Sequence, residues 1–154
     1  MSVDDFNWQR MKYIQKLHRV LYAIGLGPLI GKIILLLTTT GRKSGLKRVT
    51  PLQYEEIDGK YYLGSARGLN ADWVRNIQAN SQVNIRVKSD SYQGQAEIVT
   101  DPARFADFIE IRLERHPVMV GLMMEKVHGL SKEPSREELK KMAEKESLVI
   151  ITLL

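Results

Sequence analysis

The sequence of 154 residues lacks cysteine altogether. This absence excludes disulfides, thiolate nucleophiles, iron–sulfur clusters and cysteine-based zinc sites. Histidine is scarce too: His18, His116 and His128 are scattered along the chain, a pattern that does not favour a metal centre. The sequence also lacks a membrane-spanning run. The apolar stretch over residues 20–37 contains Lys32 and a Gly/Pro cluster, and each piece is shorter than the roughly 20 residues that a span needs.

The overall composition is that of one globular domain. Hydrophobic residues make up 44% of the chain and charged residues 27%, which provides enough apolar material for a packed core. We expect residues 1–154 to form a single domain with an N-terminal amphipathic helix within residues 1–26, since Met11, Ile14 and Leu17 recur at three-residue steps. No small-residue cleavage site follows a compact apolar core, and we therefore expect a cytoplasmic protein.

Acidic residues are missing from one long part of the chain, although the whole chain carries 18 of them beside 23 basic ones. Residues 6–54 contain no Asp or Glu and carry a charge of +9, whereas the remainder carries −4, which gives the formal net charge of +5. Its basic residues are Arg10, Lys12, Lys16, Arg19, Lys32, Arg42, Lys43, Lys47 and Arg48. Such a concentration of positive charge predicts an anionic partner. Few aromatic residues lie among these cations, which argues against nucleic acid.

Hydrophobic periodicity and turn residues predict an α+β barrel with about six mainly antiparallel strands and peripheral helices. Asp58-Gly59 is typical of a hairpin, here between the second and third strands. The expected helices cover residues 5–24, 70–80, 102–115, 118–127 and 136–146. The expected strands cover residues 32–39, 47–54, 60–65, 83–87, 92–99 and 148–154. The last strand is strongly apolar, and we expect it to be exposed and to favour a homodimer.

The most informative segment is the turn between the first two expected strands. Four cations lie there within seven residues: Arg42, Lys43, Lys47 and Arg48. Two glycines in the same turn allow backbone N–H groups to approach an anion, and arginine can bind phosphate or carboxylate through two parallel hydrogen bonds. The spacing is not that of a Walker loop. The residues alone leave two interpretations open, an anion-binding turn and a solvated basic hairpin.

Three stretches of the chain resemble the deazaflavin-dependent nitroreductase family of the flavin/deazaflavin oxidoreductases. They are LLLTTTGRKSGLKRVTPL (residues 35–52), YYLGSARG (residues 61–68) and DWVRNIQANSQVNIRV (residues 72–87), in the family's order and with similar spacing. The resemblance implies a split β-barrel, FMN-binding split-barrel-like, and an oxidoreductase that uses coenzyme F-420. This deazaflavin carries a phosphate and an oligoglutamate tail, and such a polyanion suits the basic part of the chain.

The same resemblance implies a set of cofactor-binding residues. They are Arg42, Lys43, Ser44, Lys47 and Arg48 for the phosphate and tail; Val49, Thr50, Pro51 and Leu52 beside the deazaflavin ring; Ser65, Ala66, Arg67 and Gly68 in the family's S-K-G-G-like loop; and Trp73 and Asn76 in its W-x-x-N step. Trp73 can equally be an anchor of the core. Asn76 can instead tie the loop in place.

The expected reaction is hydride transfer between reduced coenzyme F-420 and an electron-poor small-molecule substrate, with the cofactor supplying the hydride chemistry. Nitroreducing members of the family have tyrosines on the substrate side, whereas Gln53 follows Pro51-Leu52 here. Residues 116–124 form an apolar, Met-rich stretch with almost no hydroxyl groups. These departures favour an apolar or quinone-like substrate over a nitroimidazole.

Three residues are candidates for the proton donor, namely Tyr54, Ser65 and His116, and none is strongly indicated. His116 precedes a proline and is also typical of a helix end. Two further functions stay open: an FMN-binding split-barrel reductase, and a non-enzymatic protein that binds an apolar ligand or a membrane surface. The basic helix over residues 1–26 suggests peripheral membrane contact, although packing across the barrel or against a second copy explains the same pattern.

Overall fold

The computed structural model describes residues 34–154. The expected helix over residues 5–24, and with it the amphipathic segment 1–26, lies outside the described residues. Within residues 34–154, no helix combines the length and the apolar character that crossing a membrane requires.

The described residues form seven strands, four α-helices and one turn of 3-10 helix. The strands are β1 (Ile34–Thr40), β2 (Lys47–Gln53), β3 (Glu55–Ile57), β4 (Lys60–Ser65), β5 (Gln82–Val87), β6 (Asp90–Val99) and β7 (Ser147–Leu153). The helices are η2 (Gly68–Asn70), α3 (Asp72–Ala79), α4 (Pro102–Arg115), α5 (Pro117–Lys126) and α6 (Arg136–Met142). Each helix and strand predicted within this part of the chain has a counterpart here.

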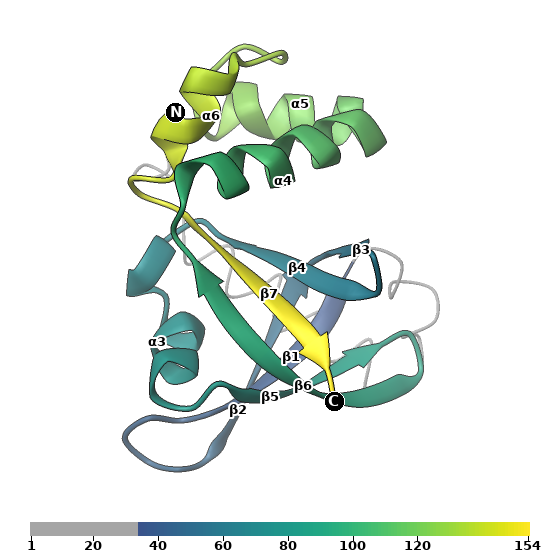
Figure 1. Cartoon of the computed structure of the whole chain (residues 1–154), viewed down its shortest axis with the longest axis vertical. Helices are drawn as coiled ribbons and strands as arrows, with labels where there is room; N and C mark the ends of the chain where they lie inside the picture. Colours follow the sequence, from purple (N-terminus) through teal and green to yellow (C-terminus); the bar gives the residue numbers. More distant parts are fainter. Residues whose placement is uncertain (1–33) are drawn as a thin grey trace.

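The strands make one sheet in the order β2-β1-β5-β6-β7-β4-β3. All neighbouring strands are antiparallel. The sheet curls into a half-barrel, and α4, α5 and α6 gather above it in the view of Figure 1. The helix α3 and the loop between β1 and β2 lie together at the lower left of the same view. The predicted α+β split-barrel-like fold is confirmed.

The single strand predicted over residues 47–54 is followed at once by another that has a different partner. β2 pairs with β1, whereas β3 pairs with β4 at the opposite edge of the sheet. Only Tyr54 separates β2 from β3, so one continuous segment runs from one edge of the curled sheet to the other. The Asp58-Gly59 hairpin therefore joins β3, not β2, to β4. The curl of the whole sheet, and not the local turn, decides where this segment changes partner.

The strand β7 corrects one expectation from the sequence. The stretch over residues 148–154 was expected to be exposed, but β7 lies between β6 and β4 inside the sheet and is buried from Ser147 to Ile151. Its side chains alternate between two cores, with Val149 in one and Leu148 in the other. The strand is apolar throughout because both of its faces are covered. From Ser147 to Ile151 it therefore offers no exposed apolar surface for a second copy.

The two hydrophobic cores lie on the two faces of the sheet. The barrel core fills the inside of the curl and includes Leu35, Leu37, Leu63 and Ile85. The second core packs α4, α5 and α6 against the outer face and is built around Phe105, Phe108, Val120, Met124 and Leu139. A space large enough for a small ligand lies between the helical layer and the strands, beside an apolar wall.

The starts of α4 and α6 follow local sequence rules, whereas the end of α6 departs from the prediction. The Asp101 side chain accepts a hydrogen bond from the N–H of Ala103 at 3.3 Å and caps α4, as predicted. Ser135 and Glu138 form the predicted capping box at the start of α6. The helix α6 ends at Met142, not at residue 146, because the next residues form tighter bonds to carbonyls three positions back.

Candidate functional site

The loop between β1 and β2 is a tight turn closed by its own backbone. The N–H of Gly41 donates to the carbonyl of Leu46 at 2.7 Å, and the N–H of Gly45 donates to the carbonyl of Gly41 at 2.8 Å. Gly45 has a φ of +71°, in the left-handed region that favours glycine. At Gly41, an added Cβ would meet the Ser44 hydroxyl at 2.8 Å and the Leu46 carbonyl at 3.0 Å. Both glycines are required by the shape of this turn.

Asn76 of α3 holds this loop in place. Its Oδ1 accepts hydrogen bonds from the backbone N–H of Arg42 at 3.2 Å and from the Arg42 guanidinium at 3.0 Å. Its Nδ2 donates to the Thr39 hydroxyl at 3.1 Å. The same guanidinium forms an ion pair with Asp72 at 3.2 Å. The W-x-x-N step therefore places Asn76 as a buried tie between the helix and the turn, as one of the two interpretations of this residue predicted.

Beside the tied loop lies a hollow of about 420 Å³, called the basic hollow below. It is lined by Gly41, Arg42, Lys43, Ser44, Arg48, Thr50, Asp72, Trp73 and Asn76. The structure thus brings together most of the residues implied for the phosphate and tail: Arg42, Lys43 and Ser44 from the β1–β2 loop and Arg48 from β2, with α3 completing the wall. Trp73 is 9% exposed and belongs to the barrel core, as expected of a core anchor, and it also lines the hollow.

The charges around the basic hollow are unbalanced. Asp72 pairs with Arg42, whereas Lys43 and Arg48 have no carboxylate within ion-pair distance among residues 34–154. An anion that enters the hollow therefore meets two cations whose charge the described residues leave unpaired. The hollow offers a guanidinium, an ammonium group and the Ser44 hydroxyl. In proteins, phosphate and carboxylate groups accept hydrogen bonds from such donors.

Other residues implied for the cofactor lie elsewhere. Lys47 lines a separate hollow of about 230 Å³, because neighbouring residues of a strand point to opposite faces. Pro51 is buried, Val49 and Leu52 are half-buried, and Leu52 packs against the barrel core. Ala66 lines a third cavity, described below. The basic hollow therefore gathers the implied residues of the β1–β2 loop and α3, but not those of the end of β2.

The implied loop after β4 is a closed turn. The buried Ser65 hydroxyl donates to the carbonyl of Gly68 at 2.8 Å. Gly68 is buried with a φ of +57°, and an added Cβ would collide with the backbone carbonyl of Lys145. Arg67 is exposed at the start of η2. The glycine is required here by the approach of the segment before β7, and the Ser65 hydroxyl already has an acceptor within the turn.

Two other candidates for the proton donor lie near the junction of β2 and β3. The ring of Tyr54 packs against that of Tyr61, with centroids 5.7 Å apart. The imidazole of His116 is about half-exposed, and its Nε2 lies 2.9 Å from Oε1 of Glu55. His116 also stands between α4 and α5, as expected of a helix end.

Glu55 was missed by sequence reasoning and is the centre of a charged cluster. Its side chain is 7% exposed and lies 3.6 Å from the Arg112 guanidinium, 3.3 Å from Arg115 and 2.9 Å from His116. Arg112 also donates to the Gln53 side chain at 2.9 Å. Burial lowers the pKa of Arg112, and the charge of Glu55 opposes that effect. One carboxylate therefore serves two guanidinium groups and an imidazole.

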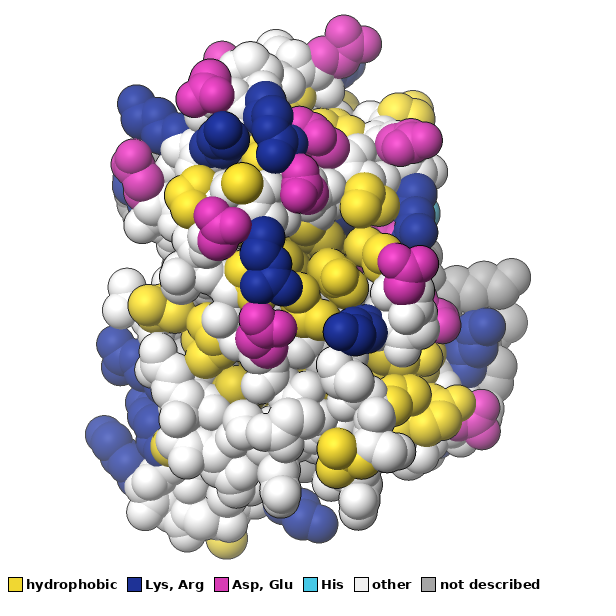
Figure 2. Space-filling model, viewed as in Figure 1, with side chains coloured by type: hydrophobic (Ala, Val, Ile, Leu, Met, Phe, Trp, Pro, Cys, Tyr) yellow, Lys and Arg dark blue, Asp and Glu magenta, His cyan; other side chains and the backbone are white. Residues whose placement is uncertain are grey.

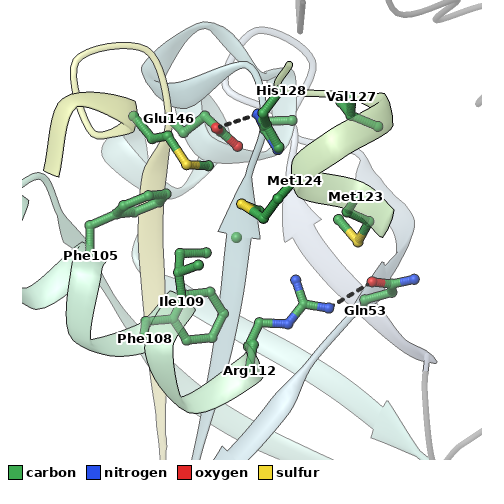
Figure 3. Close-up of a pocket in the computed structure, with 13 residues that line it drawn as sticks. Gln53, Phe105, Phe108, Ile109, Arg112, Met123, Met124, Val127, His128 and Glu146 are labelled. Carbon is green, nitrogen blue, oxygen red and sulfur yellow. Dashed lines mark hydrogen bonds and ion pairs between the residues drawn. The ribbon is translucent and has the colours of Figure 1, made fainter. Parts of the chain in front are cut away.

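A cavity of about 160 Å³ lies between the helical layer and the sheet, called the apolar cavity below (Figure 3). Phe105, Phe108, Ile109 and Arg112 of α4 line one side, and Met123 and Met124 of α5, with Val127, line the other. Gln53, Gly64, Ala66, His128, Met142 and Glu146 complete the wall. Figure 2 shows hydrophobic side chains gathered on this face where the helices meet the strands. Sequence reasoning anticipated an apolar Met-rich segment but not a cavity.

A buried polar pair closes one end of the apolar cavity. Nδ1 of His128 lies 3.3 Å from Oε2 of Glu146, and both side chains are about nine-tenths buried. Burial raises the pKa of Glu146 to about 8 and lowers the pKa of His128. Near neutral pH burial therefore favours the uncharged forms of both side chains.

The curled antiparallel sheet with its covering helices defines a protein of the split-barrel class. The family model described as F420H(2)-dependent quinone reductase matches residues 13–119. The chain belongs to this family. Its members are enzymes that transfer hydride from reduced coenzyme F-420 to quinone-like substrates.

Several solved structures share the fold of this chain. An F420-H2 dependent reductase (FDR-A) is 23% identical, with a TM-score of 0.52 over 77% of this chain and 93% of that one. A domain-swapped dimer is 20% identical, with a TM-score of 0.55 over 93% and 99%. A putative pyridoxamine 5'-phosphate oxidase from Listeria innocua is 12% identical, with a TM-score of 0.53 over 78% and 82%. At these identities the likeness shows the shared fold.

Proposed function

We propose that this chain binds reduced coenzyme F-420 with the phosphate and tail in the basic hollow, and that it reduces an apolar, quinone-like acceptor. The observation that carries the cofactor assignment is the pair Lys43 and Arg48, two cations without a carboxylate partner among residues 34–154, beside a loop whose shape is fixed. Family membership supports the choice of cofactor.

The donor set of the hollow suits a polyanion. Arg48 would hold a phosphate or carboxylate through its guanidinium, and Lys43 and Ser44 would add an ammonium group and a hydroxyl. Arg42 is already bonded to Asn76 and Asp72, so we assign it to holding the loop and adding positive potential. Lys47, on the other face of β2, would attract the tail only at longer range.

The role of the chain's own residues would be to bind the cofactor, to orient it and to exclude water from it. Bound reduced deazaflavin supplies a hydride, and the hydride chemistry belongs to the cofactor. Asn76 fixes the loop before the cofactor arrives, which lowers the ordering cost of binding. For the proton, we favour His116 over Ser65, because Glu55 orients the half-exposed imidazole whereas the Ser65 hydroxyl is buried and bonded to Gly68.

The test is a titration of the purified protein with coenzyme F-420, followed by the fluorescence of the deazaflavin. Arg48→Ala should raise the Kd at least tenfold, about 1.4 kcal/mol, because a charge-assisted contact is removed. The wild-type Kd should rise with salt, and the variant should show a weaker salt dependence. Lys60→Ala, which removes an exposed cation of the β3–β4 hairpin, is the matched control and should leave the Kd unchanged.

FMN titrated in parallel tests the alternative cofactor. An unchanged Kd in Arg48→Ala, or FMN binding more tightly than the deazaflavin, would contradict the proposal. We also propose a homodimer, supported by the domain-swapped dimer among similar structures, and measurable by light scattering. The cytoplasmic location stays a prediction from the sequence.

A further inference from the structure

We infer that the apolar cavity between α4, α5 and β4 is a binding site for a small aromatic carboxylate. The aromatic ring would lie among the Phe and Met side chains, with the carboxylate at the Arg112 guanidinium. This site is separate from the basic hollow, and the inference does not depend on the proposed cofactor.

The size and wall of the cavity suit one aromatic ring. A volume of about 160 Å³ is close to the ~150 Å³ of an apolar protein cavity that stays dry and accepts benzene. Phe105 and Phe108 offer ring faces and edges, and Met123 and Met124 offer sulfur atoms that contact aromatic rings favourably. Gly64 of β4 leaves part of the wall without a side chain: a Cβ there would lie 3.6 Å from the Phe108 ring.

Arg112 gives the cavity a positive charge that its surroundings only partly balance. Arg112 is 8% exposed, and the carboxylate that its guanidinium pairs with, Glu55, is 3.6 Å away and also serves Arg115 and His116. Its short contact at 2.9 Å is to the neutral amide of Gln53. A buried cation that shares its one carboxylate with two other basic groups favours a ligand that brings a second carboxylate.

The opposite end of the cavity does not supply that negative charge. Among the residues that line the cavity, Arg112, His128 and Glu146 are the ionisable ones. Burial favours the uncharged forms of both members of the His128–Glu146 pair near neutral pH. Figure 3 shows Arg112 and Gln53 at one end and the His128–Glu146 pair at the other, with the methionines and Phe side chains between them. A ligand with one anionic end therefore fits in one orientation.

Calorimetric titration of the whole chain at neutral pH tests the inference with benzoate, its neutral isostere benzamide, and hexanoate. Benzoate should bind with 1:1 stoichiometry and at least ten times more tightly than benzamide or hexanoate. Arg112→Met keeps an apolar side chain of similar length and should remove the preference for benzoate over benzamide. Gly64→Leu should abolish binding of all three compounds, because the new side chain fills the cavity.

The control variant distinguishes the two anion sites. Arg48→Ala should leave benzoate binding unchanged, and a loss there would mean that benzoate occupies the basic hollow, which overturns the inference. Equal binding of benzoate and benzamide, equal binding of hexanoate, or no binding of benzoate at millimolar concentration would each overturn it as well. Should Arg112→Met not fold, the wild-type comparison and Gly64→Leu still decide. Failure of coenzyme F-420 to bind would leave these results untouched.

Discussion

Replacing Glu146 by glutamine should make the protein more stable above neutral pH and should remove part of its pH dependence. The Glu146 carboxyl is buried against His128, and burial raises its pKa from the ordinary value of 4.5 to about 8. The folded protein therefore keeps a proton that the unfolded chain has lost over this range. Glutamine keeps the size and a hydrogen-bond donor without the ionisable group.

The size of the effect follows from proton linkage. Because the folded state binds the extra proton, the free energy of unfolding falls by about 1.4 kcal/mol per pH unit between the two pKa values. From pH 6.5 to pH 8 this amounts to about 2 kcal/mol of stability lost through Glu146. The whole shift of 4.5 to about 8 corresponds to about 5 kcal/mol, comparable with the net stability of a small domain.

His128 sets the pH window for the measurement. Burial lowers the pKa of His128. Its contribution to the free energy of unfolding is therefore complete above the ordinary pKa of 6.5 and is lost as the pH falls below that value. Measurements between pH 6.5 and pH 9 therefore isolate Glu146 from its neighbour. Urea unfolding of the wild type and of Glu146→Gln at steps of half a pH unit gives the two slopes, and all titrating groups common to both proteins cancel in their difference.

We expect the difference in unfolding free energy between Glu146→Gln and the wild type to rise by about 2 kcal/mol from pH 6.5 to pH 8 in favour of the variant. Parallel slopes for the two proteins would refute the reasoning, because they would mean that Glu146 is already ionised in the folded state. Glu144→Gln, which changes an exposed carboxylate two residues away, is the matched control and should leave the slope unchanged.

Three further substitutions test the local structure by urea unfolding. Asn76→Ala should lower the free energy of unfolding by about 2 kcal/mol and weaken coenzyme binding, because it leaves buried groups of the β1–β2 loop unpaired. Gln78→Ala, at an exposed position of the same helix, should lower it little. Equal losses in the two variants would contradict the tie. Gly68→Ala should cost about 3 kcal/mol, whereas Gly59→Ala, also at positive φ but in open space, should cost only about 1 kcal/mol. Ser135→Ala should cost about 1 kcal/mol through loss of the capping box, and an unchanged midpoint would argue against the cap.

The sequence predicted the elements of the fold well where short-range patterns decide them. The two glycines of the β1–β2 loop and the Asp101-Pro102 helix start depend on neighbours a few residues away, and both were predicted. A tie from Asn76 to the loop was one of two interpretations of this residue, and the structure shows that tie. Local rules suffice here because the partners are close in sequence or are set by one helix face.

Contacts set by the closure of the sheet could not be predicted in the same way. Nothing near Tyr54 indicates that the strand changes partner there, because β2 and β3 become the opposite edges of a sheet that exists only after folding. The same limit explains the error over residues 148–154. An apolar run is compatible with an exposed pairing strand and with a central strand covered on both faces, and periodicity alone does not separate the two.

The buried charged groups were missed for a related reason. Glu55 gives no local indication that it will be buried, and its partners Arg112, Arg115 and His116 come from a helix end about 60 residues later. The His128–Glu146 pair forms only because the chain after α6 returns past the end of α5 before β7 begins. Such pairs depend on tertiary packing, and the electrostatics of the apolar cavity therefore emerge only from the structure.

The central place of β7 has a consequence for how the chain folds as it is synthesised. β7 is the last of the strands within residues 34–154, and among these strands it alone joins the group β2-β1-β5-β6 to the pair β4-β3 by backbone hydrogen bonds. Until residues 147–153 have emerged from the ribosome, β6 and β4 each present an unpaired strand edge and the helices α4–α6 have no complete surface to cover. Completion of the sheet is thus a late, long-range event, of the kind that is slow and leaves a nascent chain dependent on chaperones.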